Sequence, residues 1–102
     1  MKILAIVGAS GHGKVVADLA ELCGYQVIFF DDAYPQKQTI EHWPVVGTFN
    51  DLLSSEVTDK NVIVGIGDNR IRDELTYRLI NVGFKLPVLI HPSAVVSKYV
   101  KI

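Results

Sequence analysis

The chain of 102 residues carries a formal net charge of −1, with 49% hydrophobic and 21% charged residues. This length suits one compact domain, the apolar content excludes intrinsic disorder, and the lack of a basic excess argues against a nucleic-acid-binding surface. The single cysteine, Cys23, excludes an intrachain disulfide. The apolar runs are far shorter than the roughly 20 residues of a membrane span, so we expect a cytoplasmic domain without membrane or nucleic-acid partners.

Short apolar runs alternate with amphipathic stretches along the chain. The runs predict five strands, over residues 3–7, 27–30, 44–47, 61–66 and 87–90. The amphipathic stretches predict three helices: one that ends before Gly24, a short one over 48–53 and one over 69–82. The polar segment 33–43 contains Pro35 and is predicted to be a loop. Strands that alternate with helices imply right-handed crossovers, so we expect an α/β fold with a Rossmann-like, doubly wound parallel sheet.

The first predicted strand is followed by the glycine-rich segment Gly8–Gly13, with the sequence GASGHG, which opens the first helix. A phosphate gains from the free N–H groups at a helix N-terminus, and glycine lets the backbone approach it closely. The spacing is G-x-x-G-x-G and not the G-x-G-x-x-G of dinucleotide-binding enzymes. Its place between a strand and a helix favours a phosphorylated nucleotide. The alternative is a tight turn that binds no ligand.

Two acidic residues, Asp31 and Asp32, end the second predicted strand. In doubly wound folds an acidic residue at this place reaches the ribose hydroxyls of a bound nucleotide, because a carboxylate accepts two hydrogen bonds from a diol. The alternative is that both are solvated turn residues or that one caps a helix.

A third polar segment, residues 65–72, ends the fourth predicted strand and begins a helix. Gly67 would let a base or ribose approach the backbone, and Asp68 or Asn69 suits the N-cap of the helix. Arg72 offers a forked donor to a phosphate, or else it lies on a solvated helix face. The segment therefore falls at the sheet edge where such folds bind ligands.

The three histidines lie in different sequence surroundings. His12 is inside the glycine-rich segment, where a neutral imidazole either hydrogen-bonds a substrate amine or hydroxyl or merely caps the helix. His42 lies in a polar loop and His91 in a turn, and neither suggests chemistry. The spacing of His, Cys, Asp and Glu does not resemble a metal site, so no metal is expected.

The last residues show a periodicity of six. Ile90, Val96 and Ile102 have the spacing of a hexapeptide-repeat β-helix. Three positions in a valine-rich tail do not by themselves establish such a repeat. The chain also reaches Ile102 without a closing signal, so we expect a fragment cut at the start of a second domain.

Together and in this order, these segments resemble the NeuD/PglD family of sugar acetyltransferases. The matching segments are Gly8–Val16, Phe30–Asp32, Pro44–Gly47, Gly65–Asn69 with Arg72, and Ile90–Val96. The resemblance implies an N-terminal Rossmann-like domain that binds a nucleotide sugar, often a UDP-linked 4-amino sugar. It also implies a C-terminal left-handed β-helix that binds acetyl-CoA and forms a homotrimer. Residues 1–90 would then be the nucleotide-sugar-binding domain, and residues 91–102 the start of a truncated β-helix.

The resemblance and the residue patterns together predict the substrate-binding residues. They are Ser10, Gly11, His12, Gly13, Asp31, Asp32, Gly67, Asn69 and Arg72. By resemblance, Asp31 and Asp32 would hold the uridine, and His12 would lie near the sugar amine as an auxiliary group. The family's catalytic histidine and its acidic partner belong to the β-helix, so no catalytic residue is expected in this chain.

Two functions are compatible with these patterns. The first is the substrate-binding domain of an acetyl-CoA-dependent sugar N- or O-acetyltransferase, in which the full-length protein is the enzyme and this chain alone is inactive. The alternative is a stand-alone regulatory module that binds NAD or another nucleotide. A small dehydrogenase is disfavoured, because the sequence shows neither a hydride-transfer constellation nor a substrate domain.

Overall fold

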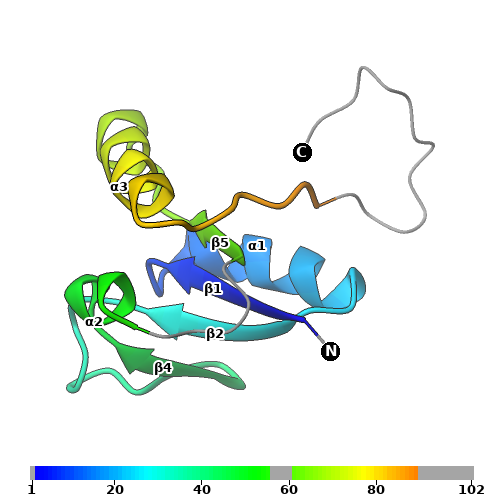
Figure 1. Ribbon diagram of the computed structural model, residues 1–102. Coiled ribbons are helices and arrows are strands. Elements are labelled where there is room, and N and C mark those ends of the chain that lie inside the picture. Colours follow the sequence, from blue (N-terminus) through cyan, green and yellow to red (C-terminus); the bar gives the residue numbers. More distant parts are fainter. Residues whose placement is uncertain (1, 56–60, 90–102) are drawn as a thin grey trace.

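The computed structural model describes residues 2–55 and 61–89 and shows a sheet with helices beside it (Figure 1). The elements are β1 (Ile3–Val7), α1 (Gly11–Leu22), β2 (Gln26–Phe30), β3 (Thr39–Ile40), β4 (Trp43–Gly47), α2 (Phe49–Leu53), β5 (Asn61–Val64) and α3 (Asn69–Asn81). Within the described residues, no helix has the length and apolar character needed to cross a membrane. The predicted domain boundary at residue 90 and the predicted β-helix start over 91–102 lie outside the described residues.

The five strands form one mixed sheet in the order β3-β4-β2-β1-β5. The strands β4, β2, β1 and β5 run parallel, whereas β3 pairs antiparallel with β4. The α/β class is confirmed, but the prediction of an all-parallel sheet is wrong, and so is the prediction that 33–43 is entirely loop, because this segment contains β3.

The prediction of a fifth strand over residues 87–90 is also wrong for residues 87–89, which the structure describes. Residues 87–89 form no strand, and pairing beside β5 is limited to an isolated bridge between Asn61 and Lys85. Proline has no N–H to donate to a ladder, so Pro87 cannot continue this pairing. The segment turns instead toward α1, where Leu89 is buried.

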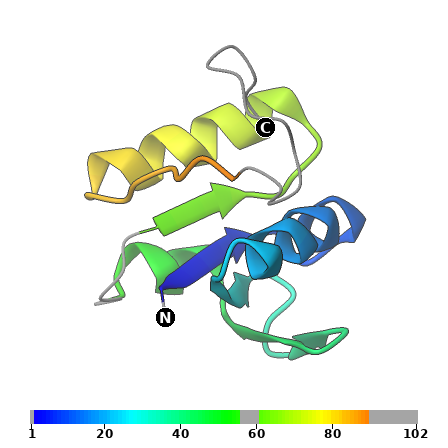
Figure 2. The ribbon, with the colours of Figure 1, turned by 90° about the vertical axis from the view of Figure 1, so that its right-hand side faces the viewer.

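Helices cover both faces of the sheet, with α1 and α2 on opposite sides in Figure 2. On one face α1 buries Ala17 and Ala20, and on the other α2 and α3 bury Leu52 and Leu79. Successive side chains of β1 alternate between the two clusters, as the pleat requires. This two-sided burial explains why the sequence of β1 is apolar without interruption.

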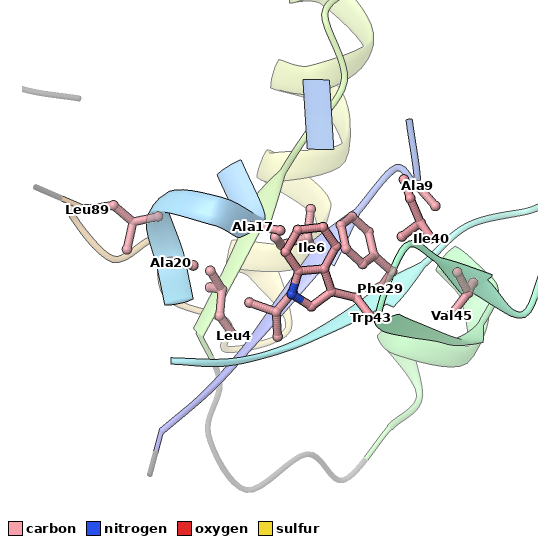
Figure 3. Close-up of a cluster of buried hydrophobic side chains, with 11 residues drawn as sticks. Leu4, Ile6, Ala9, Ala17, Ala20, Phe29, Ile40, Trp43, Val45 and Leu89 are labelled. Atoms are coloured by element: carbon pink, nitrogen blue, oxygen red, sulfur yellow. The ribbon is translucent and has the colours of Figure 1, made fainter. Parts of the chain in front are cut away.

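The core on the α1 face is built around two aromatic rings (Figure 3). The ring centroids of Phe29 and Trp43 lie 5.9 Å apart. Helix α1 buries Ala17 and Ala20 in this cluster, and Val16 and Leu19 pack partly buried against it, while Val15 and Leu22 are 69% and 56% exposed. The apolar spacing therefore predicted the helix and part of its core-facing side correctly, but the fully buried residues are small ones that let the helix approach the sheet closely.

The helix ends follow the local signals in the sequence. Thr48 and Asp51 form a capping box at α2, with bonds of 3.2 Å to the Asp51 N–H and 2.8 Å to the Thr48 N–H. Gly24 and Gly83 follow α1 and α3 with φ of 89° and 99°. Glycine adopts this left-handed conformation without a Cβ penalty, which ends each helix where the sequence predicted.

Candidate functional site

A cavity of about 410 Å³ opens at the carboxyl ends of β1 and β2, beside the β5–α3 connection. Strand β1 lies between β2 and β5, so the chain leaves β1 for one side of the sheet and later returns on the other. Open α/β sheets bind ligands at such a reversal of strand order. The cavity is lined by Val7, Gly8, Asp31, Asp32, Phe49, Asn50, Ile66, Leu75 and Arg78. We call it the edge cavity, and its volume is in the range of small-molecule sites.

Of the predicted site residues, the two aspartates line the edge cavity. Both carboxylate oxygens of Asp31 accept backbone hydrogen bonds, from the Ala9 N–H at 2.7 Å and the Ala33 N–H at 2.8 Å. Asp32 is exposed, and its Oδ1 accepts the N–H of Phe49 at the start of α2 at 3.1 Å. Asp31 is therefore engaged in holding the backbone, while Asp32 presents an exposed carboxylate at the cavity.

The four predicted residues of the glycine-rich segment divide into two groups. Ser10, Gly11 and His12 are exposed, and among the described residues the Ser10 side chain makes no capping hydrogen bond to α1. Gly13 is buried, and a Cβ there would lie 2.2 Å from the carbonyl oxygen of Gly8. The first three are available to a ligand, whereas Gly13 is required for the close contact of α1 with the loop that precedes it.

The polar side chains of the β5–α3 connection form hydrogen bonds within their own segment. The Asp68 carboxylate accepts the N–H groups of Arg70 and Ile71 at 2.9 and 3.1 Å and so caps α3. The Arg72 guanidinium donates to the Asn69 side-chain oxygen. Gly67 is exposed, and a Cβ there would meet no atom of the described chain within 4 Å. The described residues that line the edge cavity do not include Gly67, Asn69 or Arg72.

Six lining residues were not predicted as site residues from the sequence: Val7, Phe49, Asn50, Ile66, Leu75 and Arg78. The Arg78 guanidinium carbon lies 5.0 Å from the centre of the Phe49 ring, a cation–π arrangement that joins α3 to α2. Leu75 and Arg78 are three residues apart, so they share one face of α3. That spacing is the signal in the sequence, but their meeting with Phe49 depends on the tertiary fold.

An ion pair ties α1 to the β3–β4 turn. Lys14 Nζ lies 2.7 Å from Glu41 Oε1, with both side chains partly exposed. The hydrogen bond and the charge of Glu41 raise the pKa of Lys14 above its ordinary value of 10.5. Glu41 has a φ of 53°, a left-handed conformation that is uncommon for a residue with a side chain. The pair neutralises a cation that would otherwise lie free beside the glycine-rich segment.

The other histidine of the described chain lies away from the edge cavity. His42 Nε2 is 3.0 Å from Glu21 Oε1, and its ring stacks on Trp43 with centroids 4.1 Å apart. His91 lies outside the described residues. Within residues 2–55 and 61–89, no three His, Cys, Asp or Glu side chains gather as metal ligands would.

Comparison with known proteins places this arrangement in a family. The model described as the PglD N-terminal domain matches residues 3–79. The chain belongs to this family. The resemblance to the NeuD/PglD acetyltransferases seen in the sequence is therefore confirmed for the N-terminal domain.

Relatives of this chain are named as acetyltransferases. UDP-N-acetylbacillosamine N-acetyltransferase from Bacillus subtilis (strain 168) is 34% identical over 104 residues, which cover 96% of this chain and 47% of the relative. The acetyltransferase domain of PglB from Neisseria gonorrhoeae FA1090 is 43% identical, with a TM-score of 0.80 over 90% of this chain and 45% of that one.

A third similar protein has been solved with its ligands. PerB from Caulobacter crescentus, in complex with CoA and GDP-perosamine, is 35% identical, with a TM-score of 0.81 over 96% of this chain and 46% of that one. The chain thus spans about half the length of each of these relatives.

Proposed function

We propose that this chain is the nucleotide-sugar-binding domain of a sugar N- or O-acetyltransferase. The observation that carries the proposal is the edge cavity at the reversal of strand order, in a chain of the PglD N-terminal domain family. A sugar nucleotide needs donors for its diphosphate, a surface for its base and an acceptor for its N–H or hydroxyl groups. The edge of this sheet offers all three.

The diphosphate would lie at the start of α1. The first N–H groups of a helix have no intrahelical acceptor, and the helix dipole favours an anion there. The first turn of α1 carries no acidic residue, and Ser10 and Gly11 are exposed. His12 is exposed in the same turn and would hydrogen-bond the sugar amine or hydroxyl.

The nucleoside would occupy the edge cavity. Ile66 and Leu75 give it an apolar wall, and Arg78 above Phe49 gives a flat, positively charged one. The Asp32 carboxylate would accept an N–H of the base or a ribose hydroxyl. Gly67 leaves the β5–α3 side open to the ligand, and Asn69 and Arg72, which hydrogen-bond each other, would contact it through their remaining N–H donors.

Acetyl transfer would require the remainder of a longer protein. The PglB domain has been solved in complex with acetyl coenzyme A, and PerB with CoA and GDP-perosamine. The proposal places the acetyl-CoA site, the general base and trimer formation in a C-terminal β-helix, within a cytoplasmic enzyme. We therefore expect the 102-residue chain alone to catalyse no acetyl transfer and to form no stable trimer.

Titration calorimetry of the chain with UDP-sugars, GDP-sugars and NAD tests the proposal. We expect at least one sugar nucleotide to bind more tightly than NAD. Replacing Arg78→Met should weaken that binding about tenfold, since a charged contact is worth roughly 1.5–3 kcal/mol. The matched control, Arg70→Met, changes an exposed arginine of the same helix and should leave binding unchanged. Tighter binding of NAD than of every sugar nucleotide would contradict the proposal and support a regulatory nucleotide-binding module.

A further inference from the structure

Two side chains that follow β2 hold the loop between β1 and α1 at Ala9. The Ala9 N–H donates to Asp31 Oδ2 at 2.7 Å, and Lys37 Nζ donates to the Ala9 carbonyl oxygen at 2.6 Å. Ala9 is buried, with 3% exposure, and both bonds are partly buried. A hydrogen bond to a charged partner is roughly twice as strong as a neutral one. Two successive peptide groups of the loop are therefore fixed by an anion and a cation.

The orientation of these peptide groups follows from their planarity. In a trans peptide the N–H and C=O point in opposite directions. Because Lys37 holds the Ala9 carbonyl, the N–H of Ser10 points away from Lys37. Because Asp31 holds the Ala9 N–H, the Gly8 carbonyl points away from Asp31, and it lies where a Cβ on Gly13 would come within 2.2 Å of it. Asp31 and Lys37 thus set the direction in which the loop enters the first turn of α1.

We propose that Lys37 is a positioning residue, which together with Asp31 clamps Ala9 and orients the amide groups of the glycine-rich segment for an anionic ligand. The ligand part of this inference rests on the proposed function. Asp31, predicted from the sequence as a ribose contact, also acts through the loop in this proposal, since each of its oxygens accepts a backbone N–H. The segment that follows β2 therefore controls the geometry of the phosphate-binding end of α1.

The experiment measures the loop and the ligand separately on the 102-residue chain. Amide hydrogen exchange by NMR reports the Ala9 N–H, and titration with UDP and GDP reports binding. The variants are Lys37→Met, which keeps the chain length without the donor, and Lys37→Arg, which restores a cationic donor. Lys85→Met is the matched control. Lys85 is exposed and forms a bridge with Asn61 at the start of β5, whereas this loop follows the end of the parallel strand β1.

We expect Lys37→Met to accelerate exchange at Ala9 relative to the amides of β1 and to weaken the bound nucleotide about tenfold. Lys37→Arg should recover most of both effects, and Lys85→Met should change neither. Unchanged exchange at Ala9 in Lys37→Met would overturn the clamp. Weaker binding with unchanged exchange would show that Lys37 contacts the ligand directly, which also overturns it.

Two further outcomes separate this inference from the proposed function. Faster exchange at Ala9 with unchanged affinity would show that the loop is held but that its geometry does not matter to the ligand, which contradicts the positioning role. If the unaltered chain binds neither UDP nor GDP, the proposed function fails and so does the ligand role of Lys37. The exchange rates would then still decide whether the clamp at Ala9 exists.

Discussion

Two strand-to-helix loops meet at the edge of this sheet, and they are built in opposite ways. The β1–α1 loop is held from outside, by Asp31 and Lys37 at Ala9, and Ser10 makes no side-chain cap to any described residue. The β5–α3 loop is closed from within, because Asp68 accepts the first free N–H groups of α3. Both loops contain glycine, yet only the first leaves the start of its helix open to an anion.

A glycine-rich turn before a helix is therefore not by itself a binding site. What distinguishes the two loops is where the N–H groups of the first helical turn find their acceptors. In α3 the chain supplies its own carboxylate, so a phosphate would have to displace Asp68. In α1 no acidic side chain stands in the first turn, and an incoming anion meets no competitor.

The largest expected effect contrasts the glycines of the two loops. Gly13→Ala puts a Cβ 2.2 Å from the Gly8 carbonyl oxygen and 3.0 Å from the Phe29 ring. We expect a loss of about 2 kcal/mol or more in the free energy of unfolding, because overpacking outweighs the helix propensity of alanine. Gly67→Ala should stay within about 0.5 kcal/mol of the original chain. Urea denaturation measures both, and equal losses would remove the distinction between the loops.

A smaller effect contrasts the residues that precede the two helices. Asp68→Ala removes an N-cap with two hydrogen bonds and should cost about 1 kcal/mol of stability. Ser10→Ala removes no capping bond and should cost less than about 0.5 kcal/mol. Asp68→Asn serves as the control, since its side-chain oxygen can still cap α3. A Ser10→Ala loss as large as that of Asp68→Ala would show that α1 is capped after all.

The smallest effect concerns the exposed ion pair beside the first loop. Glu41→Gln should lower the pKa of Lys14 toward 10.5, because the hydrogen bond and charge of Glu41 raise it. Because the pKa of Lys14 is higher in the folded chain, the ion pair stabilises the fold fully below pH 10.5. This stabilisation is lost as the pH rises through the folded-state pKa. The difference in melting temperature between the original chain and Glu41→Gln should therefore narrow at high pH. A difference that widens with pH would contradict this assignment.

The sequence predicted the parallel strands and the helices because their signals are local. Continuous apolar runs marked β1, β2, β4 and β5, and caps and glycines marked the helix ends. Strand β3 escaped prediction because it has two residues, and its turn places Glu41, not glycine, at a φ of 53°. The predicted strand at 87–90 failed over its described residues because an apolar run also fits a segment that packs Leu89 against the α1 face.

The candidate site was predictable only where its residues follow a strand directly. The glycine-rich segment and Asp31-Asp32 can be recognised because each directly follows a predicted strand. Arg78 and Phe49, in contrast, are brought together by the packing of α2 and α3. The hydrogen bond between Asp31 and Ala9 was not predictable either, since it joins residues 22 positions apart in the sequence. Partners so far apart in the chain leave no local pattern.

The response of the backbone amides to a nucleotide sugar tests directly whether the start of α1 binds the ligand. Two-dimensional NMR of the chain, titrated with a UDP-sugar and separately with a GDP-sugar, reports both helix starts at once. We expect large, saturable shifts for the amides of Ser10, Gly11 and His12 and small ones for Arg70 and Ile71, whose N–H groups are bonded to Asp68. Shifts centred on the start of α3, or none at either helix, would contradict this expectation.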